Sequence, residues 1–247
     1  MSEESDQQVF ESKQAAREAV WSRLAEAGAA RFPLPPHRRI PNFDGARQAA
    51  ERLLALAPFS RMRHIKVNPD APQRPVRELA LRRGITVYVP SARLRSGFKR
   101  LDPANIPDDR IREAASLTRG ERWAEYVRLD ELPRMDLIVT GSVAVTPDGR
   151  RCGKGHGYGD LEYAILRELG HPATPVATTV HPLQLVESVP SDPHDLPVWM
   201  IATPDEVMHV KDPQEPPAGV DWKLITDEMR DEMQVLRELE EWKSERR

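Results

Sequence analysis

Residues 149–160 of this 247-residue chain read Gly-Arg-Arg-Cys-Gly-Lys-Gly-His-Gly-Tyr-Gly-Asp. The stretch contains five of the chain's 13 glycines, three cationic side chains and a terminal acid. A strand-like run, residues 136–140, precedes it, and a helical apolar pattern from Leu161 to Leu169 follows it. Glycine lets a backbone approach a ligand closely, and N–H groups at a helix N-terminus can bind phosphate. An anion-binding loop fits these residues, and so does a flexible glycine loop without a ligand.

The spacing of the glycines matches neither of the two common phosphate-binding fingerprints. Three residues separate Gly149 from the Gly153-Lys154 pair, whereas a Walker A loop requires four, and Gly155 stands where Ser or Thr is needed. Every second residue from Gly153 to Gly159 is glycine, which excludes the G-x-G-x-x-G pattern of dinucleotide-binding folds. Spacing alone therefore leaves phosphate binding and plain flexibility open.

Composition limits the class of protein. With 39% hydrophobic and 30% charged residues, the chain suits one globular domain, with or without tails. A formal net charge of −3 argues against bulk nucleic-acid binding, and the arginine-rich patches at 38–39, 61–66 and 93–100 are explained by solvation. Cys152 is the only cysteine, which excludes an intramolecular disulfide and a cysteine-rich zinc site. No run is apolar enough for a membrane span or a signal peptide, so we expect a cytoplasmic protein without membrane or nucleic-acid partners.

Strand-like and helical patterns alternate along the chain, which is typical of an α/β sheet with right-handed crossovers. Helices are predicted near residues 8–29, 45–57, 74–83, 119–126 and 161–169. Strands are predicted at 62–67, 85–89, 136–140, 175–180 and 199–202, with an edge strand or hairpin arm in 94–101. A turn at 147–149 suggests a hairpin that presents the glycine loop.

The expected organisation has four parts. Residues 1–7 form a disordered tail, residues 8–210 the α/β domain, residues 211–220 a linker, and residues 221–247 a charged C-terminal helix. This helix has a thin apolar stripe, and packing on the domain, oligomer formation and partial freedom all remain open for it. We expect a monomer or a homodimer.

Three further groups of residues are candidates for function, each with a plainer explanation. Lys13 and Arg17 lie four residues apart on one helix face, which suits an anion or a solvated basic surface. Asp160 is predicted to be the N-cap or a first-turn acid of the following helix, and a capping role needs no metal. His194 between Asp192 and Asp195 suggests a metal site, although such residues in a loop more often form turns and local hydrogen bonds.

Three segments resemble, in the right order, the motifs of one enzyme family. The run Arg-x-Gly-Lys-Gly-x-Gly-Tyr-x-Asp at 151–160 is similar to the R-x-G-K-G-x-G-Y-Y-D motif of 5-formyltetrahydrofolate cyclo-ligases. Lys13 to Arg17 resembles the family's amino-terminal K-x-x-x-R, and residues 192–197 resemble its E-P-H-D-V-P segment. The resemblance covers about residues 10–205 and implies a Rossmann-like three-layer α/β sandwich with a mostly parallel sheet.

The resemblance also implies a reaction and a site. The formyl oxygen of the folate is phosphorylated by Mg-ATP, and attack by the other folate nitrogen then closes the methenyl bridge with loss of phosphate. The implied ligands of the ATP phosphates are Lys13, Arg17, Arg151 and Lys154, with the loop residues Gly153, Gly155, His156, Gly157 and Gly159 lining them. Asp160 would hold Mg²⁺, Tyr158 would lie on the substrate side, and Arg151, Lys154 and Tyr158 are the implied catalytic residues.

Departures from the family pattern concentrate on the folate side. Gly159 replaces the second tyrosine of the motif, residues 68–70 (Asn-Pro-Asp) replace an acidic residue and Thr, and only Phe98 is aromatic between Leu94 and Pro107. The loop resembles more closely a divergent branch with a Gly-Lys-Gly-x-Gly-Tyr-x-Asp-Leu-Glu-Tyr motif. Besides an enzyme whose substrate is a reduced folate or an analogue, two alternatives therefore stay open. One is the same ATP site acting on another small molecule, for example a thiamine-related one, and the other is a non-catalytic nucleotide- or folate-binding protein.

Overall fold

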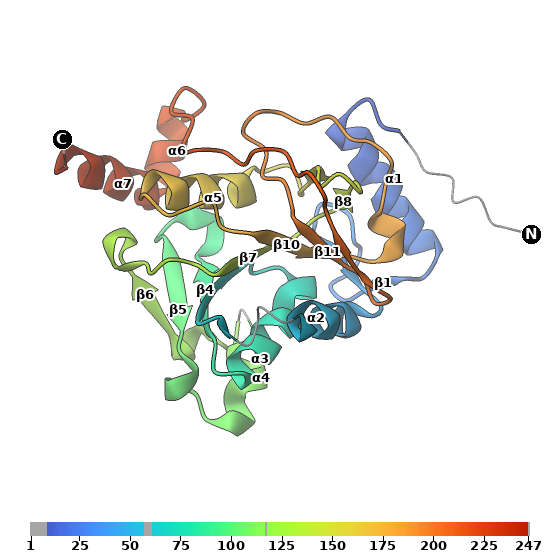
Figure 1. Cartoon of the computed structure of the whole chain (residues 1–247), viewed down its shortest axis with the longest axis horizontal. Coiled ribbons are helices and arrows are strands. Elements are labelled where there is room, and N and C mark those ends of the chain that lie inside the picture. Colours follow the sequence, from blue (N-terminus) through green and yellow to red (C-terminus); the bar gives the residue numbers. More distant parts are fainter. Residues whose placement is uncertain (1–8, 57–60, 117, 247) are drawn as a thin grey trace, which may run out of the picture.

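A mixed sheet of eight strands runs through the molecule (Figure 1), a computed structural model in which residues 9–56, 61–116 and 118–246 are described. The strand order is β12-β11-β10-β7-β3-β4-β5-β6. The five inner strands from β11 to β4 are parallel, and β12, β5 and β6 pair antiparallel at the two ends. Their bounds are β3 His64–Val67, β4 Thr86–Pro90, β5 Phe98–Leu101, β6 Ala124–Val127, β7 Leu137–Thr140, β10 Val176–Thr179, β11 Met200–Ala202 and β12 Val207–His209.

Helices cover both faces of the sheet, which explains why β7 and β10 are buried along their whole length. On one face lie α2 (Ala46–Ala55), α3 (Arg74–Arg82) and the short α4 (Ile111–Ala114); on the other lie α5 (Tyr158–Glu168) and α7 (Gln234–Ser244) (Figure 1). The predicted α/β sandwich with a mostly parallel sheet is confirmed. No helix in the described part of the chain is long and apolar enough to cross a membrane.

The first helix packs on a hairpin beside the sheet. The helix α1 spans Lys13–Glu26, and the hairpin pairs β8 (Ala144–Val145) with β9 (Arg151–Cys152). A separate hydrophobic cluster joins them, including Val20, Leu24 and Cys152. The hairpin predicted around residues 147–149 is confirmed, and α1 is shorter than the predicted 8–29. A second two-stranded pair, β1 (Ala30–Arg31) with β2 (Asn42–Phe43), follows α1.

Two features of the sheet were wrongly predicted. Residues 119–126 do not form a helix; only a short 3-10 turn at Glu121–Trp123 precedes strand β6. A cross-strand ion pair joins β5 to β6 at this edge, with Arg100 Nη2 2.5 Å from Glu125 Oε2, and Lys99 Nζ of β5 lies 2.6 Å from Glu121 Oε2 of the turn. The strand β12 was not predicted, because its three residues carry no periodic pattern long enough to detect.

Both helices nearest the candidate site also differ from prediction. The helix α5 begins at Tyr158, three residues before the predicted start, with Gly157 as its N-cap. Of the two roles predicted for Asp160, the first-turn acid is confirmed. The C-terminal segment is not one helix: α6 (Asp227–Glu232) and α7 are separated at Met233, whose φ of −115° and ψ of 86° turn a buried side chain into the core. The predicted tail at residues 1–7 and the predicted helix end at residue 57 lie outside the described residues.

Candidate functional site

The carboxyl ends of the central parallel strands border the candidate site. The chain places β4 on one side of β3 and, later, β7 on the other side, so the strand order reverses between β3 and β7. Loops that leave the sheet at such a reversal diverge, and open α/β sheets bind ligands in the resulting crevice. Residues 68–70 after β3, 91–94 after β4 and 140–141 at the end of β7 line a cavity of about 960 Å³ there.

Three segments that are distant in sequence converge beside this crevice. Lys13 of α1 donates from Nζ to Asp192 Oδ2 at 2.6 Å and also to the carboxylate of Asp195. One helical turn further along α1, Arg17 donates from Nε to the carbonyl oxygen of Gly153 at 2.6 Å. The helix α1 is thereby connected to both the glycine loop and the 192–197 segment, the three segments that carried the family resemblance.

A buried arginine links the same segments from the other side. Arg151 donates from Nη2 to Asp160 Oδ1 at 2.5 Å and from Nε to the carbonyl oxygen of Leu196 at 3.1 Å. The N–H of Leu196 in turn donates to Asp160 Oδ1 at 3.0 Å. Arg151 is only 6% exposed, and this closed set of hydrogen bonds fixes β9, α5 and the 192–197 segment relative to one another.

The glycines of the loop allow its backbone to approach neighbouring groups closely. Gly155 has φ of +104° and lies against the guanidinium of Arg17, with its ideal Cβ position 3.6 Å from Cζ. Gly157 caps α5 without a side-chain hydrogen bond, so the N–H groups of the first helical turn are not occupied by a capping side chain. At Gly159 a Cβ would lie 3.2 Å from Thr140 Oγ1, and glycine therefore permits α5 to start close to the end of β7.

Two cavities meet at this loop. The larger is the 960 Å³ crevice; the smaller, of about 300 Å³, lies between the loop and residues 217–233. The residues that line both cavities are Arg151, Gly153, His156, Gly157 and Asp160. Of the remaining predicted site residues, Lys13, Arg17 and Gly155 border the smaller cavity, and Lys154, Tyr158 and Gly159 border the larger one. The arrangement can hold two reactants on opposite sides of a shared wall.

Lys154 and Tyr158 face the larger cavity with different partners. Lys154 Nζ donates to Asp70 Oδ1 at 3.0 Å, which links the glycine loop to the loop after β3. The ring of Tyr158 stacks on His156, with centroids 5.8 Å apart and planes 12° apart. Sequence reasoning treated Asp70 only as a departure from the family pattern and did not predict this ion pair.

A buried ion pair under the larger cavity was also missed. Lys66 of β3 is fully buried; its Nζ donates to the carboxylate of Glu162 on α5 and to Asn68 Oδ1, the latter at 2.7 Å. Burial raises the pKa of Glu162, and the charge and hydrogen bond of Lys66 oppose that rise. The signal in the sequence is a lysine between Ile65 and Val67, because a charged residue at a buried position of a strand requires a partner.

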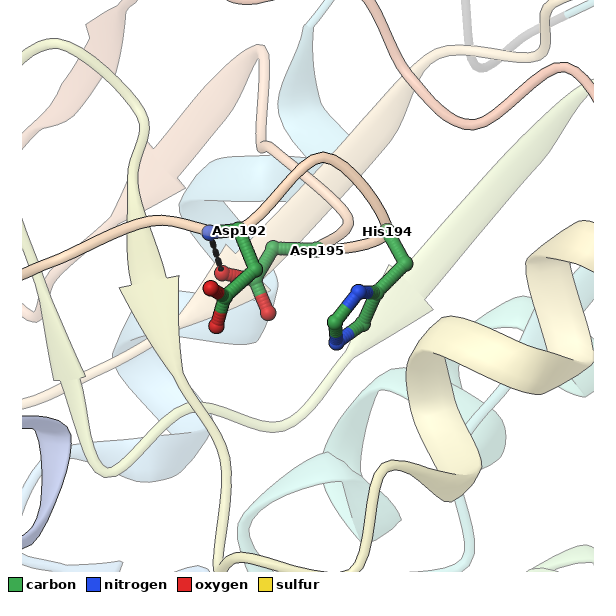
Figure 2. Close-up of side chains that lie close together, drawn as sticks. All are labelled: Asp192, His194 and Asp195. Carbon is green, nitrogen blue, oxygen red and sulfur yellow. Dashed lines mark hydrogen bonds between the residues drawn. The ribbon is translucent and has the colours of Figure 1, made fainter. Parts of the chain in front are cut away.

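Asp192, His194 and Asp195 are brought together, as the metal alternative required (Figure 2). One ligand atom from each lies within 4.8 Å of the others, and the backbone N–H of Asp192 donates to Asp195 Oδ2 at 2.6 Å. Lys13 contacts both carboxylates and already supplies a positive charge. This ion pairing lowers the pKa of Asp192, chiefly through the hydrogen bond from Lys13. The cluster is therefore explained as the anchor of α1 without a metal ion.

The wall of the smaller cavity formed by residues 217–233 is attached to α5 through Glu168. The Glu168 carboxylate accepts hydrogen bonds from the N–H of Val220 at 3.0 Å, from Trp222 Nε1 at 3.4 Å and from Lys243. Burial acts to raise the pKa of Glu168, but these hydrogen bonds, led by that from Lys243, outweigh it and lower the pKa. Val235, Leu236 and Leu239 of α7 are buried in the same core as α5, so the C-terminal segment packs on the sheet.

The fold and the cavities together define an α/β protein with a candidate small-molecule site beside a glycine loop. Its sequence matches the model of the 5-formyltetrahydrofolate cyclo-ligase family over residues 9–204, and the chain belongs to this family. The resemblance inferred from the three motifs is thus confirmed.

Individual relatives agree with that assignment. The chain is 43% identical to a methenyltetrahydrofolate synthase domain-containing protein of Mus musculus over 93% of this chain, and 38% identical to one of Homo sapiens over 92%. It spans 63% and 61% of those proteins, less than two thirds of the length of these curated relatives. The NMR structure of Aquifex aeolicus 5,10-methenyltetrahydrofolate synthetase superposes with a TM-score of 0.52 and 17% identity, covering 82% of this chain and 95% of that one. At that identity the likeness shows a shared fold.

Proposed function

We propose that the protein is a cytoplasmic ATP- and Mg²⁺-dependent enzyme that converts 5-formyltetrahydrofolate to 5,10-methenyltetrahydrofolate. The observation that supports this most is the pair of cavities with a common wall of Arg151, Gly153, His156, Gly157 and Asp160. Phosphoryl transfer requires the donor and the acceptor to approach at one point, surrounded by cations that stabilise the charge of the transferred group. ATP in the smaller cavity and the folate in the larger one would approach each other at this wall.

The reaction then proceeds in two steps. The formyl oxygen attacks the γ-phosphorus, the bond from that phosphorus to the bridging oxygen breaks, and ADP leaves. The second folate nitrogen attacks the activated formyl carbon, its proton is lost, and the C–O bond breaks to release inorganic phosphate. Arg17, Arg151 and Lys154 would stabilise the phosphoryl charge, because cations fixed before the reaction need little reorganisation. Tyr158, on the wall of the larger cavity, would contact the folate.

Asp160 is suited to hold the metal ion. Its Oδ1 accepts both hydrogen bonds, from Arg151 and from Leu196, while no described residue donates to Oδ2. Mg²⁺ commonly takes one or two protein carboxylates and completes its shell with phosphate oxygens and water. When bound, it would neutralise phosphate charge beside Arg151.

A second candidate is the same ATP chemistry on a different, anionic small molecule. The larger cavity is bordered by Arg38, Arg39 and Arg93, all exposed, and none of their side chains pairs with another described residue. Arg38 and Arg93 also adopt the left-handed backbone region, with φ of 61° and 55°, which is uncommon outside functional sites. These guanidinium groups suit a substrate with carboxylate or phosphate groups, which fits a thiamine-related phosphate as well as the glutamate carboxylates of a folate.

The two candidates are separated by incubating the purified chain with Mg-ATP and 5-formyltetrahydrofolate. We expect the absorbance of the methenyl product to rise, with one phosphate released for each product formed. ATP binding without any response to the folate would favour the second candidate. A chain that neither forms the product nor binds ATP would refute the proposed chemistry as a whole.

A further inference from the structure

The smaller cavity has two chemically different halves. One half is polar and holds the three cations Lys13, Arg17 and Arg151 beside the glycine loop, where Asp195 pairs with Lys13 and Asp160 with Arg151. The opposite half is apolar and is formed mainly by the C-terminal segment, with Leu224, Ile225, Met229 and Met233. A nucleotide has the same division, because its phosphates are strongly anionic whereas its base is flat and largely apolar.

The apolar half lies outside the part of the chain that matches the family. The family match ends at residue 204, and all four apolar residues follow residue 220. These residues are held in place by the bonds of Glu168 to Val220, Trp222 and Lys243, and by a hydrogen bond of 2.9 Å from the N–H of Leu129 to Glu238 Oε1. The segment is therefore a fixed wall of the cavity.

We propose that residues 217–233 form the base subsite of the nucleotide, an inference that rests on the proposed ATP site. Leu224 is 49% exposed at this cavity and would lose contact with water when a base packs on it. Met229 and Met233 add flexible thioether side chains, which adapt to a flat ring. The volume of about 300 Å³ is at the lower end of ordinary small-molecule sites, and the phosphates would extend to the cationic half.

The test compares Mg-ATP with inorganic tripolyphosphate, which has the phosphates but no base. Dissociation constants are measured by calorimetry for the full chain and for Leu224→Asn and Met229→Gln, which keep the side-chain size nearly constant. Leu34→Asn is the matched control, because Leu34 is also an exposed leucine, at 58%, and borders neither cavity. We expect the wild-type chain to bind Mg-ATP at least tenfold more tightly than tripolyphosphate.

Each cavity variant should weaken Mg-ATP binding about tenfold and leave tripolyphosphate binding and the melting temperature unchanged, as in the control. Unchanged Mg-ATP affinity in both variants, or equal weakening of the two ligands, would overturn the base subsite while leaving the phosphate site intact. Failure of the wild-type chain to bind either ligand would instead overturn the proposed nucleotide site, and the base subsite with it.

Discussion

Replacing Lys154 by alanine is expected to lower kcat for the ATP-dependent reaction by about 10²–10³-fold, the loss typical of one preorganised charge-stabilising group. Lys154 lies on the larger cavity next to the wall that both cavities share, and its ammonium group is held by Asp70 at 3.0 Å. From there it can stabilise the negative charge on the oxygens of the transferred phosphoryl group. Initial rates of phosphate release at saturating Mg-ATP measure the effect.

The fold should survive this substitution. The Lys154 and Asp70 side chains are 33% and 15% exposed, and such partly exposed ion pairs contribute about 0–1 kcal/mol to stability. Lys211→Ala is a suitable control, because Lys211 is exposed and borders neither cavity. Wild-type turnover in Lys154→Ala would show that this lysine has no part in the reaction, whereas an equal loss in the Lys211 control would indicate a nonspecific effect.

Replacing Lys66 by methionine is expected to lower the free energy of unfolding by about 3–5 kcal/mol at pH 7. The substitution leaves the carboxylate of Glu162, which is 3% exposed, without its cationic partner. The double variant Lys66→Met/Glu162→Leu removes both charges and should recover most of the loss, because an apolar pair of similar volume avoids the cost of desolvating ions. Urea unfolding of the wild type, Lys66→Met, Glu162→Leu and the double variant gives the coupling free energy between the two residues.

The pH dependence of this effect has a definite sign. Burial raises the pKa of Glu162 in the folded chain, and loss of Lys66 should raise it further. A carboxyl whose folded pKa is raised stabilises the fold when protonated, and this contribution is lost as the pH rises through the folded pKa. Lys66→Met should therefore be more destabilised at pH 8 than at pH 5. Equal stability of the variant and the wild type, or a double variant as unstable as Lys66→Met, would contradict the assigned ion pair.

The Lys66–Glu162 ion pair lies next to the candidate site as well as in the core. Glu162 and Asn68, both bonded to Lys66, line the larger cavity, so the buried charges lie directly beneath that cavity. Thr140 Oγ1, also buried there, has no hydrogen-bond partner among the described residues. A polar substrate group would satisfy this hydroxyl, since an unsatisfied buried polar group is costly.

Local patterns predicted much of the sheet and the order of the site motifs. The β-branched composition of β4 and β7 and the apolar period of α5 depend on neighbours in sequence, and these elements were predicted within a few residues. The strand β6 was missed because it is stabilised by pairing with β5, which a single-sequence pattern does not contain.

In the candidate site, too, residues within sequence motifs could be predicted, whereas contacts between distant residues could not. Lys13, Arg17, Arg151 and Asp160 were identified from motifs, and they do converge. The pairs Lys154–Asp70 and Lys66–Glu162 join residues 84 and 96 positions apart, so only the folded chain shows them. The apolar wall around Leu224 was likewise hidden, because the position of the C-terminal segment depends on its packing against α5.

The central claim, that the glycine loop with α1 binds ATP phosphates, is tested most directly by calorimetric titration of Mg-ATP. Arg17 is the residue to replace, because its guanidinium donates to the carbonyl oxygen of Gly153, lies against Gly155 and borders the smaller cavity. We predict one Mg-ATP bound per wild-type chain, with affinity reduced at least tenfold by Arg17→Ala and unchanged by replacing the exposed Arg119 with alanine. No binding to the wild-type chain, or undiminished binding to Arg17→Ala, would contradict the account.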